Sequence, residues 1–238
     1  MPLLPLFPLG TVLLPGGSLP LQIFERRYVV LLNDLLGEAG TSLGSAEDRA
    51  LRRGSGRSDS VPSFGVVALR RGHEVGAESV QSLFEVGCVA RIEAARPAPG
   101  PSGMRYHLQT RGTRRFAIES VVPTGAPYLV AEVTFLDERL GALPRAERLA
   151  ARVRSEVAGY RRSLGLSAVD LPADLAALAY RAADAAAFDL LTRQHILSGS
   201  DAAARLAVVL AAVRRERLLI DELQVGPVGL TLGAASPN

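Results

Sequence analysis

The sequence predicts an α+β protein in which a strongly bent β domain over residues 1–136 precedes a helical bundle over residues 137–223. In the first part, short apolar runs alternate with proline and glycine, a pattern typical of short strands joined by tight turns. From Leu143 onward, apolar residues recur every three or four positions, as they do on one face of a helix. Residues 224–238 are rich in Gly, Pro and small side chains, and we expect them to form a disordered tail.

The first elements lie between Leu4 and Tyr28, in the run LPLFPLGTVLLPGGSLPLQIFERRY. We expect two short strands there, Leu4–Leu6 and Leu19–Ile23, joined by a turn-rich loop. Proline has no N–H group to donate to a sheet ladder, so the prolines at positions 2, 5, 8, 15 and 20 confine these strands to edges, bends or barrel corners. The stretch therefore predicts a small, strongly bent β structure.

A helix is expected directly after this stretch, because the apolar spacing changes from two to three and four. Gly37 follows the pattern and is placed to end the helix. Over residues 37–62 apolar residues give way to Gly, Ser, Arg and Asp, a composition that predicts a flexible insertion. The apolar residues at helical spacing are Tyr28, Leu31, Leu32, Leu35 and Leu36.

Strands resume after the insertion, and with the opening pair they make about seven. Turns rich in Pro and Gly over Pro97–Gly103 and Pro123–Pro127 separate the later ones. The later expected strands are Phe64–Leu69, Leu83–Glu93, Arg105–Thr110, Arg115–Val122 and Tyr128–Phe135.

The bundle is expected to contain four helices, of which the second is rich in alanine. The first has its apolar stripe at Leu149, Val153, Val157, Tyr160 and Leu164. The second spans Leu171–Ala187, and the third spans Phe188–Leu197 and ends before Gly199. We expect Ser200 to cap the last helix, Asp201–Leu223, because a serine hydroxyl can accept from the unpaired N–H groups of a first turn.

Several blocks between residues 4 and 135 resemble, in the same order, the substrate-binding N-terminal domain of Lon proteases. Arg26 stands where that family usually has proline, and both residues are tolerated in the first turn of a helix. The blocks are Leu4-Pro5-Leu6-Phe7-Pro8-Leu9, Leu14-Pro15-Gly16, Leu19-Pro20-Leu21, Ile23-Phe24-Glu25, Arg27-Tyr28, Val86-Gly87-Cys88-Val89-Ala90-Arg91-Ile92, Gly112-Thr113-Arg114-Arg115-Phe116 and Pro127-Tyr128-Leu129-Val130-Ala131-Glu132-Val133.

The resemblance implies a PUA-like β pseudo-barrel that recognises polypeptide, and it implies a structural role for the family blocks. We expect Glu25 to accept hydrogen bonds at the start of the first helix and Arg27 to lay its stem over the core. Leu13 and Leu14 are our candidates for exposed peptide contacts, with core packing at a barrel end as the alternative. The structural-motif residues are Phe24, Glu25, Arg27, Tyr28, Gly112, Arg115 and Phe116.

Composition narrows the classes of partner. The net charge is only +3 and all 27 basic residues are Arg, so the long-range field is weak and we do not expect nucleic acid as a partner. Cys88 is the one cysteine, and no apolar run approaches the roughly 20 residues that span a bilayer. We therefore expect a cytoplasmic protein without a disulfide, a metal, a cofactor or a membrane anchor.

Motifs that carry chemistry have a structural explanation in each case. The string Gly40-Thr41-Ser42-Leu43-Gly44 matches a nucleophile elbow, but the elbow needs a strand before it and a helix after it, whereas here a helix precedes and the insertion follows. His73, His107 and His195 have no metal-ligand spacing with one another or with Cys88. We expect a non-catalytic protein without a metal site.

The function expected from the resemblance is recognition of unfolded or extended polypeptide, with an adaptor role for a protease or chaperone as the finer hypothesis. A sheet with proline-interrupted edges can offer backbone groups and apolar side chains to an extended segment. Two alternatives stay open, an RNA-binding protein with the PUA-like fold and an enzyme of unrecognised type, because fold resemblance alone does not choose among roles.

We expect the purified chain to hydrolyse neither ATP nor casein. A P-loop needs its lysine on the phosphates and a Ser–Lys peptidase needs its lysine as the base, and the 238 residues contain no lysine. Phosphate release and casein cleavage would be measured. Turnover that a point mutation in this chain abolishes would contradict the expectation.

Overall fold

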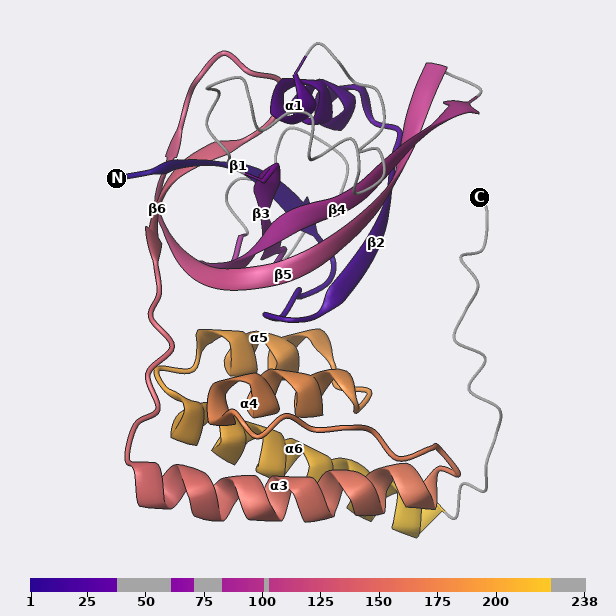
Figure 1. Ribbon diagram of the computed structural model, residues 1–238, viewed down its shortest axis with the longest axis vertical. Helices are drawn as coiled ribbons and strands as arrows, with labels where there is room; N and C mark the ends of the chain where they lie inside the picture. Colours follow the sequence, from indigo (N-terminus) through magenta and orange to yellow (C-terminus); the bar gives the residue numbers. More distant parts are fainter. Residues whose placement is uncertain (38–60, 71–82, 101–102, 224–238) are drawn as a thin grey trace, which may run out of the picture. The chain divides into compact units, whose positions relative to one another are not determined.

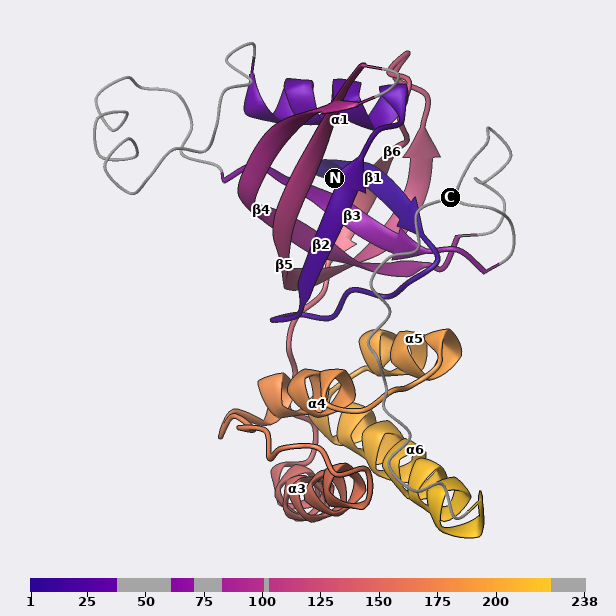
Figure 2. The same cartoon turned by 90° about the vertical axis from the view of Figure 1, so that its right-hand side faces the viewer.

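The computed structural model describes residues 1–37, 61–70, 83–100 and 103–223. The chain divides into two compact units, Met1–Asp137 and Glu138–Asn238, the first built mainly of strands and the second of helices (Figures 1 and 2). The α+β class predicted from the sequence is confirmed. The expected insertion, apart from Gly37, Val61 and Pro62, lies outside the described residues together with the elbow-like string and the tail.

The first unit is a sheet that closes on itself. Its strands follow the order β2-β5-β4-β3-β1-β6, and an additional pairing of β5 with β6 completes a barrel from which β2 extends. All neighbours are antiparallel except β1 and β3. The strands are β1 (Leu3–Leu9), β2 (Ser18–Ile23), β3 (Ser63–Ala68), β4 (Val86–Gly100), β5 (Gly103–Val122) and β6 (Val130–Phe135).

The sequence predicted two strands where the structure has one, β5. The expected break at Arg111–Arg114 is wrong, because β4 pairs with β5 on both sides of it. On its other edge β5 pairs first with β2 and then with β6, so it belongs to both parts of the sheet. Register shifts in the pairings with β4 and β6 let this 20-residue strand bend without breaking.

Prolines in β1 sit where the strand pairs on one side only. Over Leu3–Pro5 the strand pairs with β6, and over Leu6–Leu9 it pairs with β3. β1 is therefore not an edge strand, although Pro5 and Pro8 each have a single paired neighbour. The missing N–H groups thus leave no gap in a two-sided ladder.

The centre of the barrel is filled by Phe116, which is fully buried. An added Cβ at Gly65 would lie 2.7 Å from its ring, and one at Gly87 would lie 2.4 Å from the ring and 2.5 Å from the carbonyl oxygen of Val66. Both glycines therefore leave space that the ring occupies. Buried neighbours in this core are Leu4, Leu6, Val67, Val89, Ala131 and Val133.

Helix α1 (Arg26–Leu36) packs its apolar face onto the sheet, as its spacing predicted, and ends at Gly37 with a φ of 76°. The ring of Tyr28 stacks on Phe7 with centroids 4.0 Å apart, and Phe7 in turn meets Phe64 at 5.6 Å. This aromatic row joins the helix to β1 and β3.

The second unit contains α3 (Leu143–Ser163), α4 (Leu175–Asp184), α5 (Leu190–Ser198) and α6 (Ala202–Leu223). The N-cap of α6 is Asp201, whose Oδ1 accepts from Ala204 N–H at 2.8 Å, so the cap predicted at Ser200 is wrong by one residue. Asp174 caps α4 in the same way, which moves its start from the predicted Leu171 to Leu175. No helix within the described ranges is both long and apolar enough to cross a membrane.

We predict that Gly87→Ala lowers the free energy of unfolding by about 2 kcal/mol, because overpacking a full core typically costs about 1–3 kcal/mol. Chemical unfolding measures the loss. Phe116→Leu removes the ring that the new methyl group meets, so the double variant should lose less than the sum of the two single losses. Unchanged stability of Gly87→Ala, or strictly additive losses, would contradict this packing.

Candidate functional site

A groove of about 390 Å³ runs along α3 in the helical unit, and we call it the α3 groove. One wall is the C-terminal half of α3, and the other is the segment after it, which turns back along the helix (Figure 1). Its lining consists of Arg154, Val157, Ala158, Arg161 and Arg162 from α3, and of Leu166, Ala168, Val169, Asp170 and Leu171 from the returning segment.

The end of α3 makes the return possible. Gly165 has a φ of 67°, a backbone conformation that favours glycine. Its N–H donates to the carbonyl of Arg162, and the N–H of Leu166 donates to that of Arg161, so the last turn is closed by backbone hydrogen bonds. The chain therefore reverses within two residues of the helix end.

Two arginines of α3 fasten the returning segment through its carbonyl groups. Arg154 donates from Nη1 to the carbonyl of Leu171 at 2.7 Å and from Nη2 to that of Pro172 at 2.5 Å. Arg161 donates from Nε to the carbonyl of Ser167 at 2.8 Å and from Nη1 to the carbonyl of Ala185, also at 2.8 Å. Three of these bonds satisfy carbonyls of the returning segment, which has no secondary structure, and the fourth satisfies the carbonyl of the residue that follows α4. Together they hold the groove in one shape.

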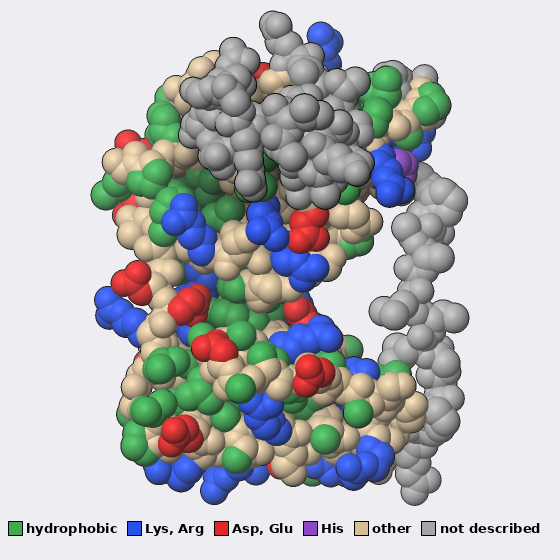
Figure 3. All heavy atoms as spheres, viewed as in Figure 1, with side chains coloured by type: hydrophobic (Ala, Val, Ile, Leu, Met, Phe, Trp, Pro, Cys, Tyr) green, Lys and Arg blue, Asp and Glu red, His purple; other side chains and the backbone are tan. Residues whose placement is uncertain are grey.

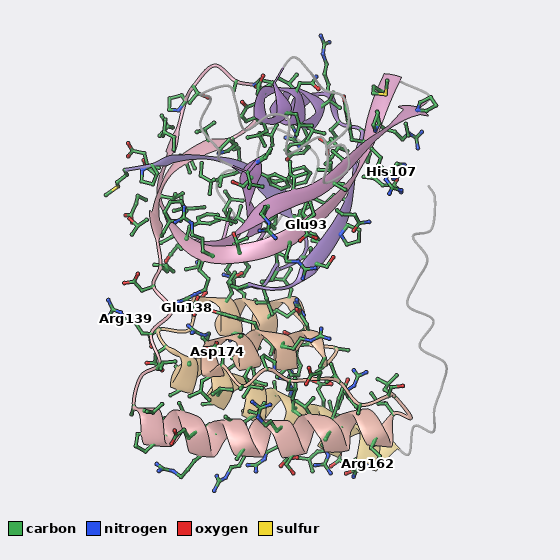
Figure 4. All side chains as sticks on the ribbon, in the orientation of Figure 1. Glu93, His107, Glu138, Arg139, Arg162 and Asp174 are labelled. Carbon is green, nitrogen blue, oxygen red and sulfur yellow. The ribbon has the colours of Figure 1, made fainter. Side chains whose placement is uncertain are left out.

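Arg162 lies beside them in the last turn of α3 and is exposed (Figure 4). Positions 154, 158, 161 and 162 fall on one face of the helix because they are separated by four, three and one residues. Apolar and basic side chains are interspersed on this side of the unit (Figure 3). The groove thus combines an apolar floor with three guanidinium groups.

The opposite side of α3 is fixed to α6 by Glu156. It accepts from Arg214 Nε at 3.0 Å and also from Arg217, and the hydrogen bond from Arg214 is the largest cause that holds the pKa of the carboxyl below its usual value. The buried residues Val153, Val157 and Tyr160 pack beneath. The helix that forms one wall of the groove is therefore held rigidly within its own unit.

A second polar cluster surrounds Arg205, which is fully buried near the start of α6. It donates to Glu138 Oε2 at 2.5 Å and to the carbonyl of Gly199 at 3.0 Å, while Tyr180 donates its hydroxyl proton to the same carboxylate. Each of these groups is used in a structural bond. The cluster fastens the first residue of the helical unit and offers no reactive group.

The peptide contacts predicted at Leu13 and Leu14 are not exposed. Leu13 is 4% exposed and Leu14 0%, because the loop that carries them folds into the barrel end. Gly112 holds this loop, since its N–H donates to Gly17 and its carbonyl accepts from Gly16. An added Cβ at Gly112 would lie 2.2 Å from the carbonyl oxygen of Leu14. Leu13 and Leu14 therefore pack in the core at the barrel end, which was the alternative given in the sequence analysis.

Residues of the motif around α1 have mixed positions. Phe24 is 69% exposed and does not belong to the core. The side chain of Glu25 makes no hydrogen bond to the first turn of α1, contrary to the expectation, because it is paired with Arg27 at 2.9 Å. The guanidinium of Arg27 lies 4.6 Å from the ring centroid of Tyr28. Arg27 therefore lies over Tyr28 in the aromatic row, in agreement with the expectation that its side chain covers the core.

Arg115 has a structural position within the barrel. It is 2% exposed and donates from Nη2 to the carbonyl of Asp137, the last residue of the first unit. Its neighbour Arg114 points to the other side and lies over the ring of Phe135. The two side chains thus lie on opposite faces of β5, as neighbouring residues of a strand do.

Within the described ranges, no group of three or more His, Cys, Asp and Glu side chains is arranged to hold a metal ion. His107 in β5 and His195 in α5 are exposed, and His73 lies outside these ranges. Cys88 is fully buried.

The sequence of the chain matches the family model described as the ATP-dependent protease La (LON) substrate-binding domain, over residues 3–215. The chain belongs to this family. The Lon resemblance read from the sequence blocks is therefore confirmed, and it extends through the helices to α6.

Two solved structures share the fold of this Lon-type chain. One is the Lon N-terminal domain protein from Xanthomonas campestris, with a TM-score of 0.54, 27% identity, and coverage of 89% of this chain and 98% of that one. The other is the N-terminal domain of the Mycobacterium avium complex Lon protease, with a TM-score of 0.59, 18% identity, and coverage of 90% and 98%.

A curated relative is Lon protease 2 of Sorangium cellulosum (strain So ce56), which is 30% identical over 230 residues. The alignment covers 91% of this chain and 24% of that protein. The Lon-type chain thus spans about a quarter of the length of this relative.

We predict that Arg154→Met loosens the α3 groove of the Lon-type chain. The substitution keeps an apolar stem and removes both donors, so the unfolding free energy should fall by about 1–3 kcal/mol. Limited proteolysis should also cut between residues 164 and 174 faster. Arg152→Met, on the same helix but outside the groove lining, is the matched control, and equal behaviour of the two variants would contradict the fastening role.

Proposed function

We propose that this chain is a non-catalytic module that binds extended segments of unfolded polypeptide in the α3 groove. Membership of a substrate-binding family supports a recognition role. The groove supports the proposed position of the binding site. Its volume of about 390 Å³ falls within the range of roughly 300–1,000 Å³ typical of ligand sites.

The groove suits apolar side chains of an unfolded segment. Leu166 is 40% exposed on the returning segment, and Val169 and Leu171 are partly exposed beside it. Covering these side chains with those of a bound segment removes apolar surface from water, and this gives about 25 cal/mol per Å². A folded globular protein has such side chains in its own core, so the groove selects unfolded segments.

The free edge of the sheet is less suited to this role. β2 pairs with β5 alone among the described strands, which makes it the candidate for adding a peptide strand. However, Pro20 lies in the middle of β2 and removes one backbone donor from a strand of only six residues. A short edge interrupted by proline is the device by which proteins prevent strand addition.

The finer proposal is that the chain delivers its bound segment to a protease. It rests on the family, whose description is the substrate-binding domain of an ATP-dependent protease, and on the absence of lysine from this chain. Without lysine the chain has neither the base of a Ser–Lys peptidase nor the side chain that contacts the phosphates in a P-loop. Any cleavage then belongs to a separate active site.

We predict that Ala158→Tyr blocks binding of a reduced and alkylated model protein that stays unfolded. Ala158 is exposed and lines the groove, and helix side chains point toward the N-terminus, so the new ring falls between Ala158 and Arg154. Fluorescence anisotropy should show affinity at least about ten-fold weaker, equivalent to about 1.4 kcal/mol.

Ala151→Tyr provides the matched control, because Ala151 is exposed on α3 one turn before the groove and its new ring points away from it. Equal losses in both variants would place the binding site elsewhere. Measurement against a short single-stranded RNA at about 50 and 200 mM salt tests the other class of ligand. Tight, steeply salt-dependent RNA binding without polypeptide binding would overturn the proposal.

A further inference from the structure

The α3 groove carries an excess of positive charge. Its lining includes the guanidinium groups of Arg154, Arg161 and Arg162 and a single carboxylate, that of Asp170. None of the three arginines forms an ion pair with a carboxylate of the described residues. The groups that Arg154 and Arg161 bind are neutral carbonyls, so the positive charge of each guanidinium is not cancelled.

Some other arginines of the same unit are paired with carboxylates. Five of them have a carboxylate partner within 4.0 Å, and these partners lie on α3, α4 and α6, at the N-cap of α5 and in the segment before α3. The unit therefore has carboxylates that pair with arginine, and none of them pairs with the three arginines of the groove. The paired arginines are Arg193, Arg205, Arg214, Arg215 and Arg217.

Stabilisation of the C-terminal end of α3 explains the position of two of the three groove arginines. Arg161 and Arg162 lie in the last turn of α3, where a cation interacts favourably with the helix dipole. That effect acts on the helix end and does not require an apolar groove beside it. It also does not apply to Arg154, which lies more than two turns earlier and whose charge adds to the same groove.

We propose that the polypeptide segment bound in the α3 groove is acidic as well as apolar, with glutamate or aspartate side chains next to large aliphatic ones. The inference rests on the proposed function and names the substrate class of that same site. Guanidinium groups form short, paired hydrogen bonds with carboxylates, and a groove with apolar walls strengthens such bonds by excluding water.

The same charges discriminate against basic segments. A lysine or arginine next to the apolar anchor would bring like charges together at the groove, and this repulsion acts as selection against the wrong ligand. Arg162 is the best placed to act on the incoming segment, because it is exposed and none of its side-chain donors is used within the described structure.

Three short peptides test the proposal with the full chain. Each is blocked at both ends and carries two leucines, flanked by glutamate in the first, by glutamine in the second and by lysine in the third. We expect the glutamate peptide to bind at least about five-fold more tightly than the glutamine peptide, and the lysine peptide to bind most weakly. The glutamate preference should decrease as salt is raised from about 0.1 M to 1 M, where the screening length falls from about 10 Å to about 3 Å.

A pair of charge reversals locates the preference. Arg162→Glu should abolish the preference for the glutamate peptide over the lysine peptide. Arg152→Glu makes the same change of charge at an exposed position of the same helix outside the groove lining, and it should preserve the preference. Neither side chain has a hydrogen bond or an ion pair in the described structure, so both variants should fold.

The outcomes separate the two proposals. Equal binding of the glutamate and glutamine peptides, with the loss in Ala158→Tyr intact, overturns the acidic preference and leaves the proposed function standing. Absence of binding by any peptide and by the unfolded model protein overturns the proposed function itself. A preference that Arg152→Glu reduces as much as Arg162→Glu shows a general charge effect and overturns the assignment to the groove. A fourth peptide, the glutamine peptide with its C-terminal carboxylate left free, tests capture of chain ends. If this peptide binds more tightly than the blocked glutamine peptide while the glutamate peptide does not, the groove captures chain ends and the acidic preference is overturned.

Discussion

The barrel depends on one close contact, the ring of Phe116 against the backbone at Gly65 and Gly87. These glycines lie on β3 and β4, and the ring comes from β5, so three strands of the sheet approach one another as closely as the absence of two side chains allows. The strand that carries Phe116, β5, also closes the barrel, because its first half pairs with β2 and its second half pairs with β6. Gly87 and Phe116, which belong to the family blocks, therefore act through shape, because the ring fills the barrel centre where the glycines leave space.

Much of this fold could be predicted from the sequence, because strands and helices depend on local periodicity. The apolar spacing over Tyr28–Leu36 predicted α1 and its buried face, and the change of period at Leu143 predicted the start of α3. Errors arose where a long-range partner decides the outcome. β5 continues past Gly112 because β4 pairs on both sides of it, and nothing within β5 itself indicates that partner.

The site could not be predicted for a related reason. Leu13 and Leu14 look exposed in a Gly- and Pro-rich loop, and only the docking of that loop on Gly112 buries them. The α3 groove depends on hydrogen bonds from Arg154 and Arg161 to carbonyl groups, and a carbonyl is present at every residue, so it leaves no pattern in the sequence. One signal was available: the spacing of positions 154, 158, 161 and 162 places basic and small residues on one helix face.

The absence of lysine gives the groove its particular chemistry. A lysine ammonium is a compact, strongly hydrated charge, whereas a guanidinium is planar, is more weakly hydrated and has five N–H donors. Arg154 can therefore hold two carbonyls of the returning segment, and Arg161 can hold one there and one at the end of α4, while both remain charged beside an apolar surface. Because the acceptors are neutral, the bonds that give the groove its shape leave its positive charge in place. In this chain the same side chains thus account for both the rigidity of the groove and its proposed preference for acidic segments.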